Sequence, residues 1–126
     1  MNVLLVDDEA SILTVFGTFL EEAGYSVQCA TDGQEAWELF QAAKGWDAVV
    51  LDRAMPQMGG EELAKLIKRE SPEIPLIMIT GAVDAILEPD LFDAILAKPF
   101  RPTELLDCLI RCGKGPSLHA APLVAN

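Results

Sequence analysis

The stretch NVLLVDDEA, residues 2–10, places four consecutive apolar residues directly before three acidic ones. An uninterrupted apolar run of this length is typical of a strand that is buried on both faces of a parallel sheet. Adjacent carboxylates repel one another and resist leaving water, so Asp7 and Asp8 at the end of such a strand call for a compensating charge. The stretch therefore predicts a buried parallel strand with an acidic site at its carboxyl end.

The composition predicts a single soluble, cytoplasmic domain. The 126 residues are 51% hydrophobic, and a chain of this size buries roughly two thirds of the surface of its unfolded form. No apolar run approaches the roughly 20 residues that a membrane span requires, and the N-terminus lacks the pattern of a signal peptide. A net charge of −11 repels nucleic acids and anionic membranes, so we expect neither as a direct partner.

The three cysteines, Cys29, Cys108 and Cys112, are expected to be free thiols that lie in the core or near the surface. Their number is odd, and disulfides are rare in the cytoplasm. A metal site at Cys108 and Cys112 would need further ligands, and the single histidine, His119, lies far along the chain.

Short apolar runs alternate with amphipathic stretches along most of the chain. This pattern predicts a parallel sheet with helices on both faces. Strands are expected at 3–6, 25–30, 48–51, 76–79 and 94–97. Helices are expected at 11–23, at 61–70 and from Pro102 onward, and a short one at 84–90, where Pro89 limits the length. A further helix is expected to begin after Asp32, which caps it together with Glu35, and to end at Gly45. Residues 113–126 have no periodicity and are expected to be a linker or disordered tail.

Ligands of an open parallel sheet bind outside the carboxyl ends of its strands. The residues expected there are Asp7, Asp8, Asp52, Thr80 and Lys98. At about 4 Å and an effective dielectric constant near 20, each pair of carboxylates costs roughly 4 kcal/mol. A divalent cation such as Mg²⁺, which binds carboxylates, carbonyls and phosphate oxygens, together with the lysine would balance the three acids. Such a site is suited to a phosphoryl group esterified to Asp52.

Four motifs in order extend this interpretation: LLVDDE (4–9), VVLDRAMPQMGG (49–60), ITGA (79–82) and KPF (98–100). Together they resemble the receiver domain of bacterial two-component response regulators over residues 3 to about 112. The resemblance implies a flavodoxin-like, doubly wound α/β fold. Its five parallel strands would lie in the order 2-1-3-4-5, in a receiver domain at 1–112.

The resemblance also implies a role for each matching residue. Asp52 would be the phosphoacceptor, and Mg²⁺ or Mn²⁺ would be held by Asp8, Asp52 and the backbone carbonyl of Ala54, with Asp7 acting largely through water. Thr80 and Lys98 would bind the phosphoryl group. The loop of Gly81 and Ala82, which extends to Ala85, would follow Thr80, and the Lys98–Pro99 bond would be cis.

The function implied by the resemblance is that of a phosphorelay switch. A histidine kinase or histidine phosphotransfer protein would donate the phosphoryl group, and the domain itself would catalyse the transfer and the later hydrolysis. Phosphorylation would change the 81–100 surface for a partner or an output domain. The 81–112 face would contact such an output domain or a second copy of the chain.

Three features depart from the family pattern. Ile95 stands three residues before the lysine, where receivers commonly carry an aromatic residue that reports phosphorylation. Positions 54 and 82, which help to govern the access of water to the acyl phosphate, are both alanine. The segment between Thr80 and Lys98 is short, which predicts a short or irregular helix there. We therefore expect signalling to depend on the 81–85 loop more than on Ile95.

Three other functions are compatible with an acidic site in an α/β fold. A phosphohydrolase with an aspartyl nucleophile typically carries a second acid two residues later, where this chain has Ala54. A receiver-like module that binds partners without phosphate would have no need of intact acids, Thr80 and Lys98. A flavin carrier would have a Ser/Thr/Gly-rich loop after the first strand, where this chain has Glu9 and Ala10.

Overall fold

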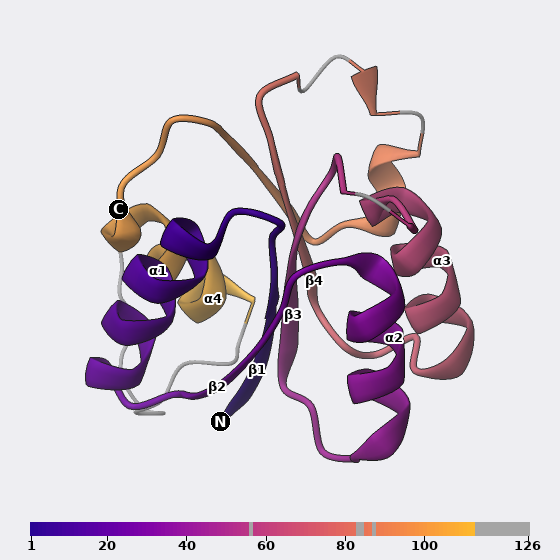
Figure 1. The fold of residues 1–126 in the computed structure, drawn as a ribbon, viewed down its shortest axis with the longest axis horizontal. Coiled ribbons are helices and arrows are strands. Elements are labelled where there is room, and N and C mark those ends of the chain that lie inside the picture. Colours follow the sequence, from indigo (N-terminus) through magenta and orange to yellow (C-terminus); the bar gives the residue numbers. More distant parts are fainter. Residues whose placement is uncertain (56, 83–84, 87, 113–126) are drawn as a thin grey trace.

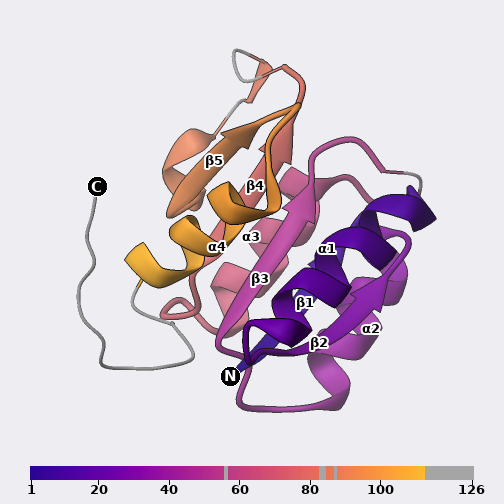
Figure 2. The ribbon, with the colours of Figure 1, turned by 90° about the vertical axis from the view of Figure 1, so that its left-hand side faces the viewer.

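The computed structural model of the protein describes residues 1–55, 57–82, 85–86 and 88–112. Five parallel strands form one sheet in the order β2-β1-β3-β4-β5 (Figures 1 and 2). The strands are β1 (Asn2–Val6), β2 (Ser26–Ala30), β3 (Ala48–Asp52), β4 (Leu76–Thr80) and β5 (Ala94–Ala97); the helices are α1 (Ala10–Glu22), α2 (Gly33–Ala42), α3 (Gly60–Glu70), α4 (Pro102–Arg111) and the 3₁₀ helix η2 (Pro89–Leu91).

The sheet is covered on both faces, with α1 and α4 on one side and α2 and α3 on the other (Figure 1). Successive residues of β1 alternate between the two cores: Val3 and Leu5 pack toward α1 and α4, and Leu4 and Val6 pack toward α2 and α3. Both sets must be apolar, which explains the uninterrupted apolar run. The predicted fold class and strand order are therefore confirmed.

The start of α2 follows the predicted capping pattern with one difference. Asp32 Oδ1 accepts a hydrogen bond of 2.7 Å from the backbone N–H of Glu35, as an N-cap side chain should. The Glu35 carboxylate, however, accepts from the backbone N–H of Thr31 at 2.8 Å, one residue before the cap. The helix ends at Ala42, before the expected Gly45, because Ala43 already adopts an extended backbone.

The connection between β4 and β5 contains no regular α-helix among its described residues. The helix predicted over 84–90 falls partly on residues 84 and 87, which lie outside the described residues. In the described part, Ala85 adopts a 3₁₀ conformation and the chain then forms the short η2, which begins at Pro89. The expectation of a short or irregular helix is therefore met where the structure describes it, and the predicted tail at 113–126 lies outside the described residues.

The three cysteines are free thiols, as expected. Cys108 is buried in the core between α4 and the sheet, whereas Cys29 is exposed. Burial raises the pKa of all three thiols, and that of Cys112 rises to about 11. Such thiols are mostly protonated near neutral pH and are weak nucleophiles. Among the described helices, none has the length and hydropathy of a membrane span.

Two glycines permit close contacts around the loop that follows β3. A Cβ atom at Gly60 would overlap the backbone carbonyl of Asp52, and one at Gly33 would lie 2.7 Å from the Cβ atom of Met58. The loop after Asp52 is thus pressed between the beginnings of α2 and α3. Gly17, in the middle of α1, differs because a Cβ atom there would make only ordinary contacts, the nearest being 3.6 Å to Cys29 Sγ.

We predict opposite effects for alanine at these sites. Gly17→Ala should raise the free energy of unfolding by about 1 kcal/mol, because alanine is the better helix former and its methyl group fits. Gly60→Ala should lower it by roughly 1–3 kcal/mol, because the methyl group displaces the backbone of Asp52. Urea unfolding followed by circular dichroism measures both, and a stabilised Gly60→Ala variant would contradict the packing described here.

Candidate functional site

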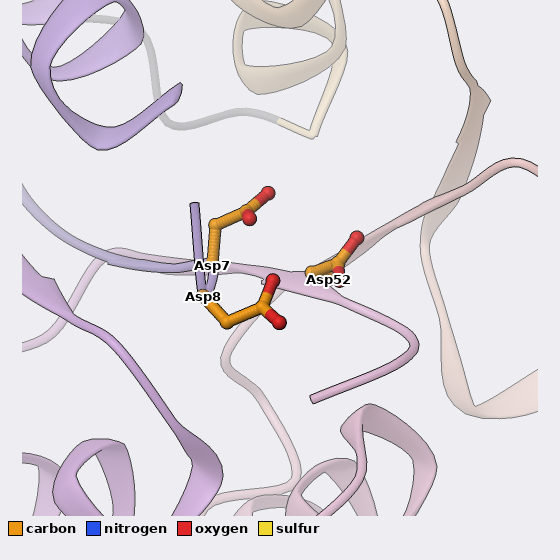
Figure 3. Close-up of side chains that lie close together, drawn as sticks. All are labelled: Asp7, Asp8 and Asp52. Carbon is orange, nitrogen blue, oxygen red and sulfur yellow. The ribbon is translucent and has the colours of Figure 1, made fainter. Parts of the chain in front are cut away.

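Two neighbouring strands bring three carboxylates together at the carboxyl edge of the sheet. Val6 of β1 pairs with Leu51 of β3, so the residues that follow lie side by side. One carboxylate oxygen from each of Asp7, Asp8 and Asp52 lies within 4.8 Å of the others. Figure 3 shows the three side chains in close proximity. Asp7 and Asp52 are buried and Asp8 is exposed, so the cluster opens to solvent on one side.

Lys98 supplies the positive charge of the site. Its backbone N–H donates to the carbonyl of Thr80 at 2.9 Å, which extends the sheet by one residue beyond β5. Its Nζ lies 2.9 Å from Asp52 Oδ1 and 3.9 Å from Asp7 Oδ2. Burial lowers the pKa of Lys98, but the hydrogen bond and the negative charge of Asp52 outweigh it, so the pKa is raised and the amine stays charged.

The loop that carries Lys98 is anchored on both sides. The Lys98–Pro99 peptide bond is cis, as the resemblance implied. The ring of Phe100 stacks on that of Phe16 in α1, with centroids 4.9 Å apart. The lysine is thus held between the end of β5 and the helix that follows the acidic pair.

Asp7 is a buried carboxylate whose charge is only partly compensated by its neighbours. Its Oδ1 accepts a hydrogen bond of 2.9 Å from the backbone N–H of Glu9, whereas its buried Oδ2 has no hydrogen-bond partner among the described residues. Burial raises the pKa of Asp7 to about 6; the hydrogen bond from Glu9 opposes this rise and the charge of Asp52 adds to it. A buried carboxylate oxygen in this state, with two further carboxylates nearby, fits a hard divalent cation.

Glu9 is a member of the site that sequence analysis missed. Its Oε1 lies 3.8 Å from Lys98 Nζ, so three acids share this amine. The Glu9 side chain is exposed, and such pairs contribute about 1 kcal/mol or less. The only signal in the sequence is its place directly after the acidic pair, where it also serves as the N-cap residue of α1.

The remaining predicted residues lie around this centre. Thr80 ends β4, is buried, and accepts a hydrogen bond of 2.9 Å at Oγ1 from the backbone N–H of Ala82. Ala82 and Gly81 are exposed, as is Ala54 beyond the end of β3. Ile95 is partly buried in β5 and pairs with a residue of β4, not with Thr80 itself. The metal ligation and phosphoryl contacts assigned to these residues stay predictions.

Comparison with known families identifies the chain. The model of the response regulator receiver domain matches residues 3–110. The protein belongs to the response regulator receiver family. Receiver domains are signalling domains of two-component systems and typically bind Mg²⁺, for which this receiver has an acidic cluster.

Curated relatives are longer than this receiver. It is 41% identical over 108 residues to a probable transcriptional regulator, ycf27, of Guillardia theta, covering 82% of this chain and 42% of the relative. It is 36% identical over 108 residues to PhoP, an alkaline phosphatase synthesis transcriptional regulatory protein of Bacillus subtilis, covering 82% and 45%. The chain thus spans about half the length of the curated relatives it matches.

Solved structures of receivers share the whole fold. The chemotaxis response regulator CheY4 of Vibrio cholerae matches with a TM-score of 0.80 and 34% identity, covering 88% of this chain and 97% of the other. The response regulator TrrA of Thermotoga maritima, solved in complex with Mg²⁺ and BeF, matches with a TM-score of 0.81 and 29% identity over the same shares. These likenesses confirm the predicted family and fold.

The raised pKa of Asp7 predicts a pH-dependent stability without divalent cations. The ordinary pKa is 3.8 and the folded value is about 6, so between them the folded protein binds more protons than the unfolded chain. Ionisation of Asp7 should therefore lower the free energy of unfolding as the pH rises through this range, by up to about 3 kcal/mol.

Asp7→Asn should remove most of this loss. In EDTA near neutral pH, the variant should be roughly 1–3 kcal/mol more stable than the wild type, and the gain should shrink as the pH approaches 4. Urea unfolding at several pH values measures it. Asp107→Asn, at an exposed acid of α4, is the matched control for net charge. A gain that is the same at all pH values would contradict the role of Asp7 burial.

Proposed function

We propose that Asp52 accepts a phosphoryl group from a phosphohistidine donor, which is a histidine kinase or a histidine phosphotransfer protein. The observation that carries this proposal is the position of Asp52 between opposite charges. Its Oδ1 lies 2.9 Å from Lys98 Nζ, while the carboxylates of Asp7 and Asp8 approach it from the neighbouring strand. The buried Asp52 carboxylate thus lies at a strand end where the neighbouring Asp8 is exposed, so a donor can approach the site from that side.

The transfer is a displacement at phosphorus. The Asp52 carboxylate forms the new P–O bond, the P–N bond to the donor histidine breaks, and its electron pair stays on the imidazole nitrogen. A divalent cation held by Asp8, Asp52 and the Ala54 carbonyl, with Asp7 through water, would neutralise charge on the transferring oxygens when bound.

Lys98 and Thr80 stabilise the phosphorylated form of Asp52. Esterification replaces a single negative charge on Asp52 by roughly two, and the Lys98 ammonium compensates part of this increase. The Thr80 hydroxyl accepts the N–H of Ala82 and can donate its own proton to a phosphoryl oxygen. Hydrolysis by water later restores the carboxylate. The chain acts in this way on itself and turns over no external substrate, because Ala54 provides no second acid.

The output is proposed to involve the surface near residues 81–100. Relatives about twice as long are named as transcriptional regulators, so an output domain that controls transcription is the partner we favour for this face. A second copy of the chain through the 81–112 face is the other partner that the fold allows. Direct contact of this receiver with DNA is disfavoured by its net charge of −11.

Phosphorylation by a small donor tests the proposal directly. With acetyl phosphate and Mg²⁺, the intact protein should gain the mass of one phosphoryl group, and EDTA should lower the initial rate about 100-fold or more. Asp52→Asn should abolish the gain, whereas Asp107→Asn should leave it unchanged. A phosphoryl group that persists in the Asp52→Asn variant would overturn the assignment of the acceptor.

A second prediction concerns the surface that responds. Because Thr80 is hydrogen-bonded to the N–H of Ala82, beryllofluoride with Mg²⁺ should shift the amide resonances of Thr80, Gly81 and Ala82 more than that of Ile95. Heteronuclear NMR of the free and beryllofluoride-bound protein measures these shifts, with the Asp52→Asn variant as the control. Unchanged resonances across residues 81–100 would exclude this surface as the output.

A further inference from the structure

The segment after β4 is attached to the rest of the molecule by a set of polar contacts. Arg53 Nη2 donates to the backbone carbonyl of Ala85 at 3.3 Å, and Arg53 Nε lies 3.8 Å from Glu61 Oε1. The other oxygen of Glu61 accepts from the backbone N–H of Glu88 at 3.1 Å, and the Glu88 carboxylate pairs with Lys65 Nζ at 3.1 Å. Arg53 and α3 thus hold the described residues of this segment through polar contacts, in addition to the buried side chain of Ile86 and the packing of Leu91 against the core.

The backbone of Arg53 is fixed next to the phosphoacceptor. Arg53 follows Asp52 directly, its N–H donates to the carbonyl of Ile79 at 2.9 Å, and its carbonyl accepts from Gly60 at 2.9 Å. Its Nε is buried and makes no hydrogen bond within the described part of the chain. Because the backbone of Arg53 is fixed at the end of β3, the position of its guanidinium group, and of the Ala85 carbonyl that it binds, depends on the position of this strand end.

Hydrogen bonds connect the far end of this contact back to Thr80. The N–H of Ala85, whose carbonyl Arg53 binds, donates to the carbonyl of Ala82 at 3.0 Å. The N–H of Ala82 in turn donates to Thr80 Oγ1 at 2.9 Å. Among the described residues of this segment, Thr80 and Ala82 are therefore held at the end of β4, and Ala85 is held by a side chain from the end of β3.

We infer that Arg53 is a positioning residue for phosphoryl transfer: through the carbonyl of Ala85 it holds Thr80–Ala82 beside Asp52, whose strand pairs with β4. The inference rests on the proposed function of Asp52. Ordering a loop around a bound group costs conformational entropy, and a contact that orders the loop beforehand reduces this cost. Arg53 reaches Ala85 and not the reacting atoms, so it acts through the Thr80 hydroxyl.

The test compares three variants of the protein. Arg53→Met keeps most of the aliphatic stem and removes the donors, Arg53→Lys keeps the charge and one donor group, and Arg69→Met removes an exposed arginine near the far end of α3 as the control. Two quantities are measured for each: amide hydrogen exchange at Ala85 and Glu88 in the free protein, and the affinity for beryllofluoride in the presence of Mg²⁺.

Arg53→Met should speed exchange at Ala85 and Glu88 about tenfold and weaken beryllofluoride binding roughly three- to tenfold, as expected for the loss of one hydrogen bond. Arg53→Lys should recover most of the slow exchange and most of the beryllofluoride affinity, and Arg69→Met should change neither the exchange nor the affinity. Mg²⁺ affinity measured in parallel should not fall in Arg53→Met, because the Arg53 side chain contacts Ala85 and Glu61 and, among the described residues, none of the three carboxylates.

The outcomes separate the inference from the proposed function. Unchanged exchange in Arg53→Met overturns the anchoring, and faster exchange with unchanged beryllofluoride affinity overturns the positioning role while leaving a structural one. Affinity restored in Arg53→Lys with exchange still fast would show that charge alone acts, which also overturns it. If the wild type binds no beryllofluoride, the proposed function fails and the positioning role fails with it, whatever the exchange data show.

Discussion

Repulsion among the carboxylates at the end of β1 and β3 is the constraint on which the rest of the structure depends. Each close pair costs roughly 4 kcal/mol at an effective dielectric constant near 20, which is about what the burial of two large apolar side chains contributes. Asp7 and Asp52 are nevertheless buried, because the strands that carry them are fixed by the cores on both faces of the sheet. The apolar packing of the strands thus compensates the free-energy cost of holding these carboxylates close together.

Lys98 relieves this repulsion only in part. Its amine lies closest to Asp52, and the longer distances to Asp7 and Glu9 leave the buried Oδ2 of Asp7 without a hydrogen bond among the described residues. In the proposed function, the remaining negative charge favours the binding of a divalent cation. In the proposed function, the same lysine then faces a phosphoryl group on the residue that it already binds, so little reorganisation is required.

Sequence patterns predicted the strands and the central site residues because each depends on local chemistry. An apolar run ending in acids requires a strand with buried faces, and parallel strands bring Asp7, Asp8 and Asp52 to one edge whatever the details of packing. The contacts of Glu9 with Lys98 and of Arg53 with Ala85 could not be predicted in this way. They join residues far apart in the sequence through long, flexible side chains, whose direction is set by tertiary packing and not by any periodicity.

The β4–β5 connection shows how a short segment alters the balance of forces at a proposed output surface. A helix packed by apolar residues is held by many contacts that are lost together. Here the buried side chain of Ile86 and the packing of Leu91 against the core are joined by hydrogen bonds and ion pairs of Arg53, Glu61 and Lys65. Each such contact contributes about 1 kcal/mol, so a change of charge at Asp52 competes with attachments of similar size. In the proposed function, a surface held in this way responds to phosphorylation without an aromatic residue at position 95, because the loop after Thr80 carries the change.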